Sequence, residues 1–175
     1  MMLKRRYMAL LGVGMLVMPT LTSCQSVDDE RIPAVPVAIR LGDAGRWNTY
    51  GVSGFGLCRY FIRQTGEPAN FPYTEQTYTG FGGVLLIGGM DPYTGDTQIP
   101  LAYDLACPVE CKPDVRVRVN PDNFEAICPV CDSHYDVTMA GGAPLSGPAA
   151  QGNPKYGLKR YSCIPTQNGG YDIMR

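Results

Sequence analysis

The chain has 175 residues, a formal net charge of −1 and 18% charged residues. It carries no basic stripe, which argues against a nucleic acid as its partner. With 21 glycines, 15 prolines and 11 tyrosines, the composition favours a loop-rich β protein over a helical one.

The first 23 residues are expected to be a signal peptide. Lys4-Arg5-Arg6 is a basic start, and the apolar stretch from Met8 to Met18 is short for a membrane span. The segment that follows, Leu21-Thr22-Ser23-Cys24, resembles a bacterial lipobox. This resemblance implies cleavage before Cys24 and acylation of that residue, so that lipid alone anchors the mature chain to a membrane. The alternative is an uncleaved signal anchor with an incidental cysteine.

Residues 24–31 are expected to form an acidic tether. Its sequence, Gln25-Ser26-Val27-Asp28-Asp29-Glu30, resembles the acidic export tags of some surface lipoproteins, and an ordinary solvated linker is the equal alternative. Residue 26 is Ser instead of an Asp that would retain a lipoprotein in the inner membrane. The sequence therefore favours the bacterial outer membrane, at its periplasmic face or at the cell surface.

Residues 32–175 are predicted to form one all-β domain. No segment after residue 31 keeps a helical apolar pattern for three turns. Strands are expected at 35–41, 57–63, 83–88, 101–106, 115–119, 124–127 and 156–163. The stretch 61–100 is expected to be a long irregular connection that carries short strands.

Four of the seven cysteines form two tight pairs, Cys107-Pro-Val-Glu-Cys111 and Cys128-Pro-Val-Cys131. Short loops of this spacing can direct four sulfurs at one point, which is typical of a metal or cluster site. Cys58 and Cys163 remain once the lipobox cysteine is set aside. They are either a disulfide, which a compartment outside the cytoplasm permits, or two buried thiols.

From residue 101 to residue 163 the chain resembles the Rieske fold. Cys128 falls on a cysteine ligand of that family, and Cys131 on a histidine ligand. Ser133 and Tyr135 match hydroxyls that hydrogen-bond to the cluster and to cysteine sulfurs in the family, and Gly147-Pro148-Ala149 matches the loop that covers the cluster. The resemblance implies an antiparallel β-sandwich or barrel with a small metal-binding subdomain, at about 104–148, formed by two Cys loops.

The chain departs from the family at its ligands. Val109 stands where the first histidine ligand is expected, and Lys112 and Val130 replace the cysteines that form a disulfide in many members. The one histidine, His134, occupies a variable position between Ser133 and Tyr135. A standard Rieske centre with two imidazoles cannot be built from these residues.

Three interpretations of the four cysteines remain. Cys107, Cys111, Cys128 and Cys131 hold a 2Fe–2S cluster through thiolates alone, or they bind one structural zinc ion, or they form disulfides without metal. With a cluster, the protein is an electron carrier with a redox protein partner and neither a catalytic site nor a small-molecule substrate. With zinc or disulfides, it is a non-redox lipoprotein in an interaction or assembly role.

Overall fold

The computed structural model describes residues 26–175. The predicted signal peptide and the predicted lipid attachment site, Cys24, lie outside these residues. In the described part of the chain, no helix is both long enough and apolar enough to cross a bilayer.

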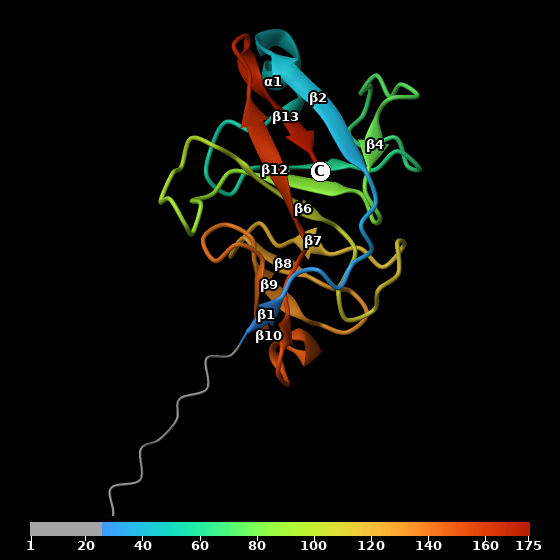
Figure 1. Ribbon diagram of the computed structural model, residues 1–175, viewed down its shortest axis with the longest axis vertical. Coiled ribbons are helices and arrows are strands. Elements are labelled where there is room, and N and C mark those ends of the chain that lie inside the picture. The colour runs from blue at the N-terminus through green and yellow to red at the C-terminus, as the bar shows by residue number, and fades with distance from the viewer. Residues whose placement is uncertain (1–25) are drawn as a thin grey trace, which may run out of the picture.

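The all-β prediction is confirmed: a seven-stranded antiparallel sheet curls into a nearly closed barrel (Figure 1). Its strand order is β3-β5-β6-β12-β13-β2-β4. In chain order these strands are β2 (Val37–Asp43), β3 (Cys58–Phe61), β4 (Tyr78–Thr79), β5 (Val84–Ile87), β6 (Leu101–Asp104), β12 (Arg160–Pro165) and β13 (Gly169–Met174).

A smaller antiparallel sheet, with order β10-β9-β8-β7, packs against one end of the barrel and occupies the lower half of Figure 1. Its strands are β7 (Arg118–Val119), β8 (Glu125–Ile127), β9 (His134–Asp136) and β10 (Ala143–Ser146), and a 3-10 turn, η1 (Pro148–Ala150), follows β10. The small sheet and its loops correspond to the predicted metal-binding subdomain.

Strand β5 explains how the two parts share one hydrophobic core. All four of its side chains are buried, and successive side chains of a strand point to opposite faces. Val84 and Leu86 pack inside the barrel, whereas Leu85 and Ile87 pack beneath the small sheet with Cys107, Cys128 and other residues. The continuous apolar run at 83–88 therefore marks a strand that is covered on both faces.

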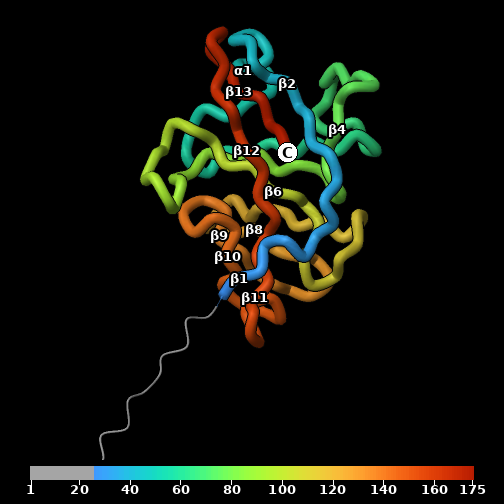
Figure 2. The backbone as a smooth tube through the Cα atoms, viewed as in Figure 1, coloured from blue at the N-terminus to red at the C-terminus, as the bar shows by residue number. Residues whose placement is uncertain are grey.

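Residues 26–31 are docked on the domain, although the sequence predicts a tether there. Strand β1 (Val27–Asp28) pairs in parallel with β11 (Lys155–Tyr156), so that blue and red segments lie side by side near the small sheet (Figure 2). The apolar side chain of Ile32 is fully buried behind this pair. We call residues 26–32 the N-terminal strap.

Several element boundaries differ from the sequence-based expectation. The expected strand at 115–119 is reduced to β7, and the single closing strand expected at 156–163 is divided between β11 and β12. Strand β13 and the short helix α1 (Ala44–Tyr50) were not expected. The helix begins where the Asp43 carboxylate accepts a hydrogen bond from the Arg46 N–H at 2.9 Å.

Candidate metal centre

The first Cys loop follows β6 and is closed by its own backbone. The Cys111 N–H donates to the Cys107 carbonyl at 2.9 Å, and the Cys107 N–H donates to the Val115 carbonyl at 3.0 Å. Cys111 takes a φ of 50°. The loop thus folds back within one turn.

The second Cys loop, between β8 and β9, repeats this closure. The Asp132 N–H donates to the Cys128 carbonyl at 3.1 Å, and Asp132 takes a φ of 53°. The Cys128 N–H donates to the Ser133 carbonyl at 3.0 Å, which fixes the loop on the hairpin. In each loop the residue four positions after the first cysteine is therefore left-handed and bonded back to that cysteine.

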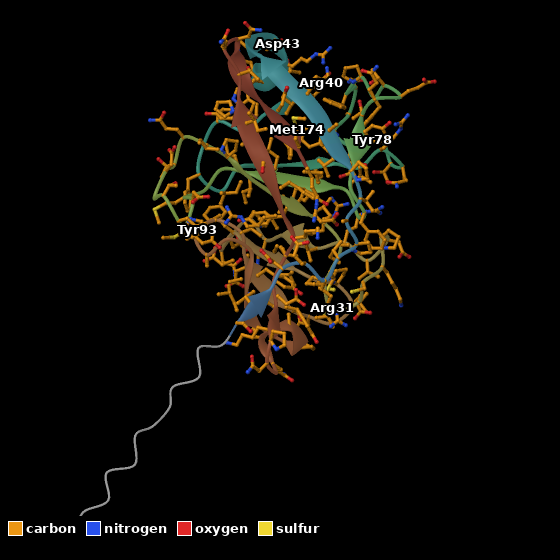
Figure 3. The ribbon with its side chains drawn as sticks, viewed as in Figure 1. Arg31, Arg40, Asp43, Tyr78, Tyr93 and Met174 are labelled. Atoms are coloured by element: carbon orange, nitrogen blue, oxygen red, sulfur yellow. The ribbon has the colours of Figure 1, made fainter. Side chains whose placement is uncertain are left out.

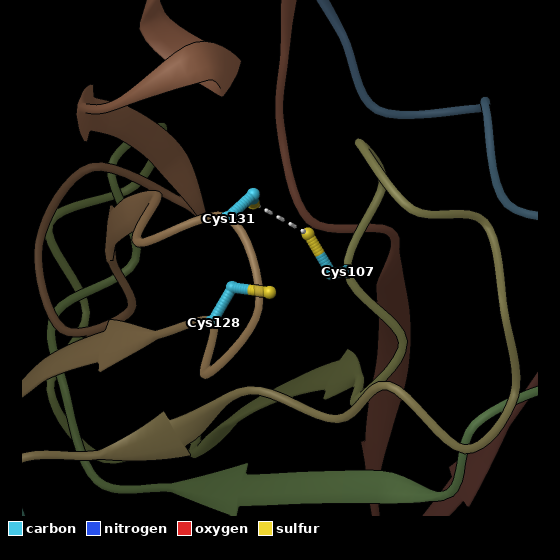
Figure 4. Close-up of side chains that lie close together, drawn as sticks. All are labelled: Cys107, Cys128 and Cys131. Atoms are coloured by element: carbon cyan, nitrogen blue, oxygen red, sulfur yellow. Dashed lines mark hydrogen bonds between the residues drawn. The ribbon is translucent and has the colours of Figure 1, made fainter.

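Three sulfurs meet between the two loops. The Sγ atoms of Cys107, Cys128 and Cys131 lie within 4.8 Å of one another and turn toward a common point (Figure 4). The shortest recorded separation, between Cys107 and Cys131, is 3.6 Å. Cys107 and Cys128 are buried, whereas Cys131 is partly exposed. Three close cysteines of this kind could hold a metal ion.

Cys111, the predicted fourth ligand, does not belong to this group. Its sulfur contacts the Pro108 carbonyl oxygen at 3.1 Å and accepts a hydrogen bond from the Arg31 Nε at 3.3 Å. The sequence predicts that four sulfurs converge, whereas the structure brings three together. Cys111 lies on the first Cys loop, but its sulfur is outside the group.

Hydroxyl groups contact two of the three sulfurs. The Tyr135 hydroxyl lies 3.5 Å from the Cys107 sulfur, and the Ser133 hydroxyl lies 3.2 Å from the Cys131 sulfur. The Ser133 oxygen also accepts a hydrogen bond from the Ala149 N–H at 3.1 Å. Both hydroxyls are fully buried and come from β9 or the residue before it, as the resemblance implies.

The Gly147-Pro148 segment covers the second Cys loop. A Cβ on Gly147 would lie 2.6 Å from the Asp132 carbonyl oxygen and 2.7 Å from the Ser133 Cα. Pro148 begins the 3-10 turn η1 and is itself exposed, whereas Ala149 is buried against the loop. Only a residue without a side chain permits this approach, so Gly147 fixes the distance between loop and cover.

The thiols differ in acidity because their surroundings differ. Burial raises the pKa of the Cys107 thiol to about 12, although the Tyr135 hydroxyl acts in the opposite direction. Burial also disfavours the charged form of Cys131, but hydrogen bonds with Ser133 and contacts with neighbouring sulfurs outweigh it and lower the pKa of that thiol. Cys131 therefore ionises more readily than Cys107, and the thiolate is the form that binds a metal ion.

The sulfur separations suit a thiolate-bound metal. A tetrahedral ion with metal–sulfur bonds near 2.3 Å requires sulfurs about 3.8 Å apart. The recorded distance of 3.6 Å and the upper limit of 4.8 Å bracket that value. The three sulfurs could therefore occupy three corners of such a site, whereas the Cys111 sulfur contacts Arg31 and the Pro108 carbonyl oxygen instead.

His134 points away from the sulfurs. Its Nδ1 lies 2.7 Å from Glu125 Oε2, and its Nε2 lies 3.5 Å from Asp132 Oδ1. The Glu125 carboxylate raises the pKa of His134 above its ordinary value. The histidine thus belongs to an ion-pair cluster on the outer side of the hairpin.

The predicted disulfide between Cys58 and Cys163 is not formed. Both residues are free thiols. Cys58 lies in β3 and Cys163 in β12, and two strands, β5 and β6, separate them in the sheet. Three strand spacings amount to about 14 Å, whereas a disulfide needs Cα atoms within about 7 Å. The two thiols are separate, as in the alternative, but both residues are partly exposed instead of buried.

Arg31 is the site residue that the sequence does not reveal. It lies in the segment expected to be a tether, and no motif connects it with Cys111, which is 80 positions away. Only the parallel pairing of β1 with β11 brings it to the first Cys loop.

Comparisons with known proteins do not assign the chain. No protein-family model matches it, and no curated protein matches it significantly.

Proposed function

We propose that this protein is a Rieske-like electron carrier in which Cys107, Cys128 and Cys131, completed by Cys111, hold a 2Fe–2S cluster. The observation that carries the proposal is the convergence of three sulfurs from two loops, with hydroxyl groups on two of them. Hydroxyls directed at sulfur are typical groups that orient the ligands of a metal centre and adjust its charge.

The packing around the site supports a redox role over a purely structural one. Cys107 and Cys128 lie in the same apolar cluster as Leu85, Ile87 and Tyr103 of the barrel. This shared apolar cluster attaches the subdomain to the barrel, so a metal ion is not needed as the sole attachment. Cys111 and Cys131 are partly exposed, which leaves one side of the centre within reach of a partner.

Four thiolates would give the cluster a low reduction potential. Replacing two neutral imidazoles by thiolates adds about two negative charges, which disfavour the incoming electron. No ligand would titrate near neutral pH, so the potential would not change with pH as it does for histidine-ligated centres.

A single zinc ion is the second candidate. It is favoured by the sulfur separations, because three sulfurs within 4.8 Å of one another can share one tetrahedral ion directly. The function would then be interaction or assembly without electron transfer.

Metal analysis of anaerobically purified protein tests these candidates. A brown protein that contains iron and acid-labile sulfide supports the cluster, and loss of both in Cys107→Ser, but not in the control Cys58→Ser, would assign the ligand. A colourless protein with one equivalent of zinc, lost in the same variant, would establish the second candidate. A colourless, metal-free protein would exclude both.

We also propose that lipid on Cys24 anchors the chain to the bacterial outer membrane. The proposal is supported by the lipobox-like segment Leu21-Thr22-Ser23-Cys24 and by Ser26. Cell fractionation tests it: the wild type should sediment with outer membranes, and Cys24→Ala should not carry acyl groups. Equal acylation of both proteins would contradict it.

A further inference from the structure

The N-terminal strap reaches the first Cys loop through Arg31. The Arg31 Nε donates to the Cys111 sulfur at 3.3 Å, and its guanidinium carbon lies 4.0 Å from the centroid of the Tyr156 ring. Figure 3 shows Arg31 in the lower half of the molecule, level with the small sheet and far from Asp43. The guanidinium is therefore held between an aromatic face and a cysteine sulfur.

The strap fixes Arg31 independently of that sulfur. The Lys155 N–H donates to the Ser26 carbonyl at 3.0 Å, and the Gly157 N–H donates to the Asp28 carbonyl at 2.9 Å. On the other side of Arg31, the buried Lys159 ammonium contacts Glu30 and donates to the Ile32 carbonyl at 2.9 Å. The backbone at residue 31 is thus held on both sides.

Arg31 carries a charge that an all-thiolate centre needs. Four thiolates around one divalent ion, or around an oxidised 2Fe–2S cluster, leave an excess of negative charge. Within residues 26–175, no other Lys or Arg side chain hydrogen-bonds to a sulfur of the two Cys loops. A cation on one sulfur lowers the energy of the bound centre and favours addition of an electron.

We infer that Arg31 is a positioning residue of the metal centre, which orients the Cys111 sulfur and compensates its charge. The inference rests on the proposed function, because it concerns the same four cysteines. The N-terminal strap is then a third segment of the site, beside the two Cys loops, and it sets both the metal affinity and the reduction potential.

The test compares Arg31→Met with Arg175→Met in the otherwise intact mature chain. Methionine keeps an apolar stem over Tyr156 but removes the charge. Arg175 contacts Glu30 of the strap at 3.0 Å and does not touch a cysteine, so its variant controls for strap docking alone. Zn²⁺ affinity, measured by competition with a chromophoric chelator, and the reduction potential of the iron-loaded protein are the two readouts.

In Arg31→Met the Zn²⁺ affinity should fall roughly two- to fivefold, the range for an exposed ion pair, and the reduction potential should become more negative. Both effects should shrink at high salt, because Arg31 is exposed. Arg31→Lys should restore most of the potential, since it restores the charge. In Arg175→Met both quantities should stay at the wild-type value.

Unchanged affinity and potential in Arg31→Met, in a wild type that binds metal, would overturn the inference and leave the proposed function intact. Equal losses in both variants would also overturn it, because strap docking alone would then explain them. A wild type that binds neither iron nor zinc would overturn the proposed function and this inference together.

Discussion

The side chains of the second Cys loop alternate in their environments. Ser133 and Tyr135 are buried and contact sulfurs, whereas His134 between them faces outward to Glu125. Successive residues of a strand point to opposite faces, so the same β9 segment provides hydroxyls to the site and an imidazole to the surface. The one histidine of the chain is thereby directed away from the three sulfurs.

The contact between His134 and Glu125 predicts a pH-dependent stability. Glu125 raises the pKa of His134 in the folded protein. The ion pair therefore contributes its full stabilisation at pH values below the pKa of histidine in the unfolded chain, about 6.5. The contribution is lost as the pH rises through the higher folded pKa. The free energy of unfolding of His134→Asn should fall below that of the wild type by less than about 1 kcal/mol at pH about 5.5, and the two should converge near pH about 8.5.

Urea denaturation of both proteins over this pH range measures the difference. A constant difference at every pH would contradict the prediction, because it would show that packing, and not ionisation of His134, is responsible.

These residue positions were predictable to different extents. The contacts of Ser133 and Tyr135 with sulfurs were expected from the resemblance to the Rieske fold, and not from any strand pattern at 133–136. The placement of the Cys111 sulfur could not be expected, because its contact with Arg31 depends on a segment 80 positions away.

At the scale of elements, the cover of the site depends on one backbone conformation. Gly147 has a φ of 76° and a ψ of −169°, a region that is essentially restricted to glycine. It lets η1 approach the second Cys loop closely enough for the Ala149 N–H to reach Ser133. The second Cys loop, the Ser133 hydroxyl and η1 are therefore held together.

Gly147→Ala should destabilise the protein by about 2–4 kcal/mol, because the added methyl is both strained and in contact with the Asp132 carbonyl. Gly95→Ala is the matched control. Gly95 also has a positive φ, of 72°, but nothing lies within 4 Å of its added Cβ, so it should cost only about 1–2 kcal/mol. Chemical denaturation of both variants measures the difference. An equal loss in the free energy of unfolding would show that the close contact of Gly147 with the Asp132 carbonyl does not affect stability.

At the scale of the whole molecule, one buried lysine holds the strap on the barrel. Lys159 is 1% exposed, and its ammonium contacts the Glu30 carboxylate and the Ile32 carbonyl. A buried charge requires such partners, since an unpaired ammonium in an apolar environment is costly. The strap and the residue before β12 therefore stabilise each other.

Lys159→Met should lower the free energy of unfolding by about 1–3 kcal/mol, because the Ile32 carbonyl loses a charged donor while the apolar volume is kept. Amide hydrogen exchange in residues 27–32 should become faster than in the wild type, and faster than in the strands of the barrel. Lys112→Met, at an exposed position of the first Cys loop, should change neither quantity. Slow exchange in the strap of Lys159→Met would show that β1 and Ile32 suffice to hold it.

The architecture was predictable where local patterns determine it. Glycine-bounded apolar runs and alternation located β5, β6 and the β7–β8 hairpin, because each is set by its own residues. Strand β13 and the parallel pair β1–β11 have no comparable signal. They are specified by long-range pairing with β2, β12 and residues 155–156, which a single sequence does not display.

The parallel pairing of β1 has a consequence for how the molecule would rest on a bilayer. One residue, Gln25, separates Cys24 from Ser26, where the docked segment begins, so the two Cα atoms are at most about 7 Å apart. If Cys24 carries acyl chains, this short linker would restrict rotation of the domain relative to the membrane surface. Its small sheet would stay close to the lipid headgroups, and any protein partner of that sheet would have to approach it along the membrane plane.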